Sequence, residues 1–163
     1  MGDATLLARA RTYQAVALRR MGDVPGTEQA AREAFAAGEA AQLFPYLGAA
    51  EACQAWVTWK AGRLQDAATR AKTAVDWWRR SAHAFPFRWL ANLLLLDWYC
   101  TNEDLDLART TVSDLLAPDQ QVLGGALWSS LQSAIQDMDG GEPSRIGKAL
   151  REVLRQAHLQ RYL

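Results

Sequence analysis

The chain has 163 residues, half of them hydrophobic, and its 18 lysines and arginines balance 18 aspartates and glutamates. This length suits one domain, which we expect to span residues 1–163. The neutral balance argues against nucleic acid as a partner, because nucleic-acid binders usually carry a basic excess.

Apolar spacing, together with the placement of proline and glycine, predicts an all-α chain. Gly22-Asp23 and Gly140-Gly141 are typical of helix ends. Pro25 and Pro143 suit the first turn of the helix that follows. The other prolines mark boundaries between pairs of helices: Pro45, Pro86 and Pro118. In chain order the predicted helices are 4–21, 25–42, 46–61, 63–80, 85–101, 104–117, 119–139 and 143–161.

The sequence repeats itself about every 40 residues. Phe44-Pro45-Tyr46 aligns without gaps with Phe85-Pro86-Phe87, and the same offset places Leu64 on Leu105. The outer segments join this register. Together they define four equivalent turn positions: Gly22, Gly62, Glu103 and Gly141.

Columns counted from these turns hold small or apolar residues, with Thr27 as the polar exception. Seven residues before the turn they are Ala15, Ala55, Leu96 and Ala134. Five residues after the turn they are Thr27, Ala67, Ala108 and Ile146, and nine residues after it they are Ala31, Ala71, Val112 and Leu150. Twelve residues after the turn they are Ala34, Ala74, Leu115 and Val153, and thirteen residues after it they are Phe35, Val75, Leu116 and Leu154. The spacings after the turn trace one helical face. We therefore expect four antiparallel pairs of helices that stack their apolar faces: 4–42, 46–80, 85–117 and 119–161. Ala67 and Ala74 should be buried at a helix seam, and a change at Gln65 should be nearly neutral.

The second pair resembles the tetratricopeptide repeat. Gly62-Arg63-Leu64-Gln65-Asp66-Ala67 followed by Ala74 matches its turn glycine and its two small positions, and Ala55 matches the small position of the first helix. Glu103, Thr27 and Ile146 depart from that pattern, and the period is near 40 residues where the family has 34. The resemblance implies a right-handed superhelix of about four antiparallel helix pairs, an α-solenoid.

The chain also resembles the C-terminal helical regions of large bacterial signalling ATPases, including maltose-activator-like transcription regulators. Three segments carry this likeness: Trp59 to Trp77, Phe85-Pro86-Phe87-Arg88-Trp89-Leu90 and Arg161-Tyr162-Leu163. It implies either a fragment that works beside flanking domains of a larger protein or a stand-alone relative.

No arrangement of catalytic or metal-binding residues is visible in the sequence. His83 and His158 are far apart, and neither has a ligand residue at metal-binding spacing on its helix. Gly124-Gly125 and Gly140-Gly141 lack the lysine and hydroxyl residue of a phosphate-binding loop. We therefore expect no enzyme activity, no metal and no cofactor. His83 should be an exposed loop residue, and His158 a cation near a helix end.

Two features bear on cellular location. The longest purely apolar run, Leu93 to Leu96, is far too short to span a membrane. Cys53 and Cys100 do not form a Cys-x-x-Cys motif, and they indicate two thiols in a reducing compartment. The start of the chain has no signal-peptide pattern. We expect a cytoplasmic protein with no membrane partner.

Tetratricopeptide arrays usually bind partners on the concave surface lined by the first helix of each pair, and the resemblance maps this groove onto named positions. They are Arg9, Thr12, Val16, Arg19 and Arg20 in the first pair, Ala49, Ala52, Trp56, Trp59 and Lys60 in the second, and Leu90, Leu93, Asp97, Cys100 and Thr101 in the third. Trp56 and Trp59 share a helix face with cations beside them, which is the composition of a binding hot spot. We expect an acidic and apolar peptide to bind there. The alternative is that both tryptophans pack against the neighbouring helix.

The expected function is a non-catalytic scaffold for a protein or peptide partner. Other functions stay open: a ligand-sensing regulatory domain of a bacterial signalling ATPase or transcription regulator that holds a small effector, an RNA-binding helical repeat, or a structural spacer. A peptide binder should show saturable, salt-sensitive binding, whereas a sensor should shift its melting temperature with a small molecule.

Overall fold

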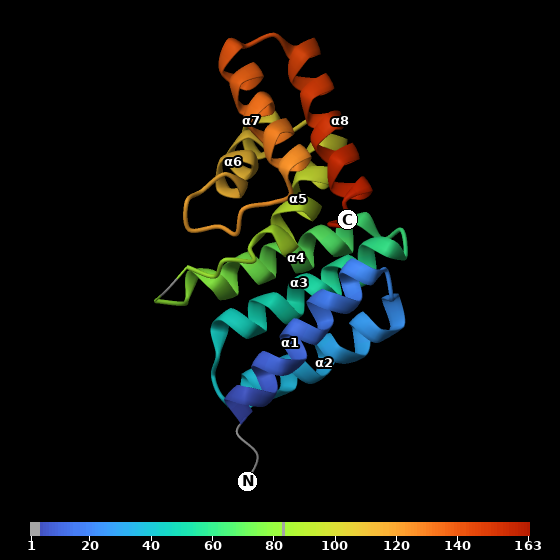
Figure 1. Cartoon of the computed structure of the whole chain (residues 1–163), viewed down its shortest axis with the longest axis vertical. Helices are drawn as coiled ribbons and strands as arrows, with labels where there is room; N and C mark the ends of the chain where they lie inside the picture. Colours follow the sequence, from blue (N-terminus) through green and yellow to red (C-terminus); the bar gives the residue numbers. More distant parts are fainter. Residues whose placement is uncertain (1–3, 83) are drawn as a thin grey trace.

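The computed structural model describes residues 4–82 and 84–163, which form eight α-helices and no strand, as predicted (Figure 1). The expectation for His83 lies outside the described residues. The helices are α1 (Ala4–Met21), α2 (Val24–Ala40), α3 (Phe44–Lys60), α4 (Leu64–Arg79), α5 (Trp89–Thr101), α6 (Leu105–Leu115), α7 (Gly125–Gly140) and α8 (Pro143–Leu159).

The four turn positions share a left-handed backbone conformation. The φ angles of Gly22, Gly62, Glu103 and Gly141 are 82°, 77°, 57° and 80°. At the first three turns the following residue donates its N–H to the carbonyl five residues earlier, which closes the helix end. The donors are Asp23, Arg63 and Asp104, with distances of 3.0, 3.2 and 2.9 Å.

The repeat columns form the core. Every residue seven before the turn, or five, nine or twelve after it, is buried, with at most 8% of its surface exposed. The residues thirteen after the turn are all half-buried. Ala67 and Ala74 are buried as predicted, and Gln65 is exposed. Equivalent positions therefore occupy equivalent environments in all four pairs of helices.

Two helices begin later than the sequence predicts. α5 starts at Trp89 where we expected 85, and α7 starts at Gly125 where we expected 119. The segments before them bond to each other instead, because the main-chain N–H of Gln121 donates to the carbonyl of Pro86 at 2.8 Å and the side-chain amide of Gln120 donates to the same carbonyl. A proline disfavours helix in the residue before it, and residues 85 and 117 lie outside any helix.

Each helix packs against the next one along the chain, and the first helices of the first three pairs, α1, α3 and α5, also lie side by side. This order changes at the fourth pair. Among the described residues α8 packs against α5, while α7 does not. In Figure 1 the helices α7 and α8 stand at the top, and the chain then returns to the middle of the molecule, beside the first two pairs.

Candidate functional site

A buried cation lies in the last turn of α1. Arg19 is only 1% exposed. Its Nη1 donates to the carbonyl oxygens of Leu90 at 2.8 Å and Ala52 at 3.3 Å, and its Nη2 donates to that of Tyr162 at 3.0 Å. Its Nε has no hydrogen-bond partner among the described residues. One guanidinium thus joins α1, α3, α5 and the segment after α8.

Aromatic rings surround this cation and two others. The guanidinium of Arg19 lies 5.3 Å from the ring of Trp89 and 5.7 Å from that of Trp56. The guanidinium of Arg20 lies 3.9 Å from the ring of Tyr162. The ammonium of Lys60 lies 4.8 Å from the ring of Trp59 and 5.2 Å from that of Trp56. Such contacts stabilise cations on ring faces. The cation–aromatic cluster is defined here as Arg19, Arg20, Trp56, Trp59, Lys60, Trp89 and Tyr162.

The cluster carries positive charge without matching carboxylates. None of its three cations forms an ion pair with any residue that the structure describes. The carboxylate of Asp97 accepts a hydrogen bond from the indole N–H of Trp59 at 2.8 Å. The cluster is therefore suited to an anionic group from outside the chain.

Burial shapes the protonation of the cluster. It lowers the pKa of Arg19 to about 10, which still leaves the side chain charged at neutral pH. It also lowers the pKa of Lys60, as does the charge of Arg19. Cys53 lies next to Arg19, but burial outweighs that charge and raises the pKa of its thiol to about 11. Cys53 is therefore a neutral thiol near pH 7, not a reactive thiolate.

The structure brings most of the predicted site residues into one place: Arg19, Arg20, Trp56, Trp59, Lys60 and Asp97. The others, Arg9, Thr12 and Val16, lie nearer the start of α1. Seven of the fifteen predicted groove positions are buried, and a partner does not reach their side chains in this arrangement: Thr12, Arg19, Ala49, Ala52, Trp56, Leu90 and Leu93. Arg20, Trp59 and Asp97 are half-buried, whereas Arg9 and Lys60 are exposed.

The two tryptophans of the predicted groove differ. Trp56 packs inside the protein and its indole N–H lacks a partner. Trp59 reaches the surface, where its ring lies 5.4 Å from that of His158. Arg19 bonds main-chain carbonyls where we expected a partner's carboxylate, because the segment after α8 and the start of α5 close over it.

Sequence reasoning did not place Trp89, His158 or Tyr162 in the site. Tyr162 is buried and its ring meets that of Trp89 at 4.9 Å, nearly perpendicular. Its hydroxyl accepts a hydrogen bond from the N–H of Gly124 at 3.1 Å. No periodic pattern in the sequence relates residues 158–163 to α1, so their contact could not be predicted. The only hint was that these segments contain aromatic residues.

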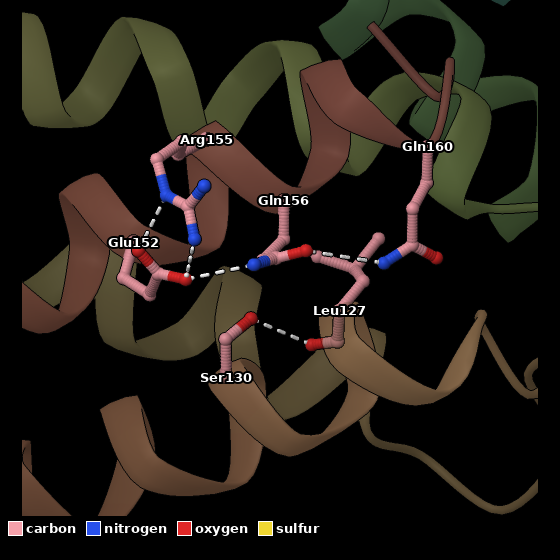
Figure 2. A network of polar contacts seen from close by, with 6 residues as sticks. All are labelled: Leu127, Ser130, Glu152, Arg155, Gln156 and Gln160. Carbon is pink, nitrogen blue, oxygen red and sulfur yellow. Dashed lines mark hydrogen bonds and ion pairs between the residues drawn. The ribbon is translucent and has the colours of Figure 1, made fainter.

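A cavity of about 580 Å³ lies between α7 and α8. Its buried polar side chain, Ser130, bonds to the carbonyl of Leu127 at 2.8 Å, and its carboxylate, Glu152, is held by Arg155 and Gln156 (Figure 2). These bonds lower the pKa of Glu152 to about 2. Both groups already have partners, so this cavity is a weaker candidate than the cation–aromatic cluster.

Compared with models of protein families, with curated proteins and with solved structures, the chain matches none. In the described part of the chain no helix is long and apolar enough to cross a membrane. Nor do His, Cys, Asp and Glu side chains gather there in a group that could hold a metal ion.

Proposed function

We propose that the protein is a non-catalytic scaffold that binds an acidic and apolar segment of a protein partner. The binding surface is the accessible part of the cation–aromatic cluster: Arg20, Trp59 and Lys60, called here the open rim. The observation that carries this proposal is that Arg20 and Lys60 lie over aromatic rings and have no carboxylate partner in the part of the chain that the structure describes. A carboxylate supplies the missing charge, and the half-buried indole of Trp59 supplies apolar contact.

In this proposal the chain is a tetratricopeptide-like array, a right-handed superhelix of four helix pairs with its binding groove along α1, α3 and α5. The shared turn conformation, the buried repeat columns and the side-by-side packing of these three helices support it. If the chain is part of a larger protein, the acidic segment that binds the rim can belong to a flanking domain of that same protein. The two unpaired thiols suit a reducing compartment, and we place the protein in the cytoplasm.

The second candidate is a ligand-sensing regulatory domain of a bacterial signalling ATPase or transcription regulator. The observation in its favour is a small polar cavity between α4, α5 and α6, described below. Binding there would leave the open rim free, so the two functions are separable by experiment.

An array of synthetic peptides tests the scaffold proposal. Peptides that combine glutamate and leucine should be retained, and peptides in which glutamine replaces glutamate should not. The double variant Arg20→Glu with Lys60→Glu should lose about tenfold or more in affinity, because it reverses the charge of the rim.

The matched control reverses two cations of α8, Arg145→Glu with Lys148→Glu, and changes the net charge equally. It should bind like the wild type, with both variants keeping the wild-type melting temperature. Equal loss in the rim variant and the control, or no loss in either, contradicts the proposed surface.

A further inference from the structure

A cavity of about 310 Å³ lies between α4, α5 and α6 and contains none of the cluster residues. α5 forms its floor with Asn92 and Tyr99. α4 contributes Lys72 and Arg79 to one wall, and α6 contributes Asp114 to the other. An adjoining cavity of about 260 Å³ shares Arg79, Asn92 and Asp114. The volume is at the lower end of known ligand sites, so any ligand must be small.

Asn92 is the unusual residue of this floor. It is only 4% exposed, yet its side-chain amide makes no hydrogen bond with the residues that the structure describes. Its amide is not among the fully enclosed polar groups that lack a partner, so the amide opens onto the cavity and is available to a ligand. A primary amide offers one carbonyl acceptor and an NH₂ donor, which complement the N–H and carbonyl of a peptide unit.

In the preceding repeat, the polar residue at the position equivalent to Asn92 has a side-chain partner. Glu51 stands eleven residues before its turn, as Asn92 does, and pairs with Arg70 at 2.8 Å. The position of Arg70, eight residues after the turn, is Thr111 in the third repeat. The hydroxyl of Thr111 donates to the carbonyl of Leu107 in its own helix at 2.7 Å. Asn92 and Thr111 of the third repeat thus stand where the second repeat has an ion pair, and the amide of Asn92 has no partner among the described residues.

Each wall of the cavity also carries a charged side chain that forms no ion pair with a described residue: Lys72 on α4 and Asp114 on α6. The ammonium of Lys72 lies 5.7 Å from the ring of Tyr99, and neither Lys72 nor Asp114 forms an ion pair with a described residue, whereas Arg79 pairs with Asp76 at 3.0 Å. Asp114 and Asn92 line the adjoining cavity as well, but Lys72 and Tyr99 do not, which places the two charges toward opposite ends. The seven residue steps of the helix from Asn92 to Tyr99 rise about 10 Å. Three extended residues span about the same length.

We propose that this cavity binds a free peptide of about three residues. Its ammonium group lies at Asp114, its first peptide unit pairs with the amide of Asn92, and its carboxylate lies at Lys72. The site is independent of the proposed scaffold function, since it shares no residue with the open rim.

A ¹⁵N NMR titration with trialanine, up to about 10 mM, tests the proposal. The side-chain amide signal of Asn92 should shift saturably. Trialanine with an acetylated N-terminus and an amidated C-terminus should bind at least about tenfold more weakly, because both charges are removed. Alanine itself should also bind at least about tenfold more weakly, since it cannot span the two ends.

The decisive variant rebuilds the ion pair of the second repeat with Asn92→Glu and Thr111→Arg. It should keep the wild-type melting temperature and lose the trialanine response. If it does not fold, the exposed Lys72→Ala gives the same test and should weaken binding about fivefold or more. The proposal is overturned by no saturable shift of Asn92, by equal binding of the blocked peptide or of alanine, or by unchanged binding in a folded variant.

Discussion

Arg19 shows how a single side chain can tie distant segments together. Its burial is unfavourable for a cation, but three carbonyl oxygens and two indole rings surround it. The carbonyls belong to α3, α5 and the segment after α8, so this one side chain is bonded to three separate parts of the fold. The residue predicted as a partner contact is therefore first a structural one.

Removing the guanidinium of Arg19 should therefore weaken the fold. Arg19→Met keeps much of the volume but removes the side-chain hydrogen bonds to the carbonyls of Ala52, Leu90 and Tyr162. It should lower the free energy of unfolding by about 2–4 kcal/mol. Arg19→Lys should also destabilise, because a compact ammonium cannot serve three carbonyls as a planar fork does.

Urea unfolding monitored by circular dichroism measures both variants. Arg20→Met is the control, since Arg20 is half-buried and only touches rings, and its loss should change stability by less than about 1 kcal/mol. Equal destabilisation at positions 19 and 20 would contradict the tie that Arg19 is argued to form.

At the scale of single elements, each turn between paired helices requires a residue with positive φ. Glu103 adopts a φ of 57° where the other repeats have glycine. A side chain is strained in this region. Glu103→Gly should therefore raise the free energy of unfolding by about 0.5–1 kcal/mol, and Gly62→Ala should lower it by about 1 kcal/mol. Thermal unfolding of both variants would count against a shared turn conformation if the two changes had the same sign.

The helix seams give a second element-scale prediction. Ala67 is 1% exposed and Gln65, two residues earlier in α4, is exposed. Ala67→Leu should overpack the seam and cost about 1–3 kcal/mol, while Gln65→Leu should be nearly neutral. Melting temperatures compare the two directly, and similar shifts would reject the assigned register.

The sequence was sufficient for these elements because their signals are local and periodic. The turn residues and the columns of Ala15, Ala31 and Ala34 recur at a fixed spacing, and each lands in its expected environment. The starts of α5 and α7 were wrong, because the bonds of Gln120 and Gln121 to Pro86 join segments more than thirty residues apart. The same reason hid Tyr162 from the candidate site.

At the scale of the whole molecule, the final pair of helices departs from simple stacking. α8 packs against α5, and the chain after it returns to the end of α1 through Tyr162. The end of α1 and the last residues of the chain thus meet at the cation–aromatic cluster, and Figure 1 shows the C-terminus in the middle of the molecule. Arg20, Trp59 and Lys60 remain accessible at the edge of this closure, which is the surface that we propose for a partner.

Site-specific photo-cross-linking in the source cell tests the scaffold proposal most directly. A benzophenone amino acid at Tyr13, an exposed aromatic of α1 beside Arg9 and Phe87, should yield an adduct with an acidic and apolar segment of one protein. Its yield should fall when Arg20 and Lys60 are both changed to glutamate. The same probe at Gln136, an exposed residue of α7, should not capture that segment. Equal capture at both positions, or capture at Tyr13 that the rim variant leaves unchanged, would contradict the proposed binding surface.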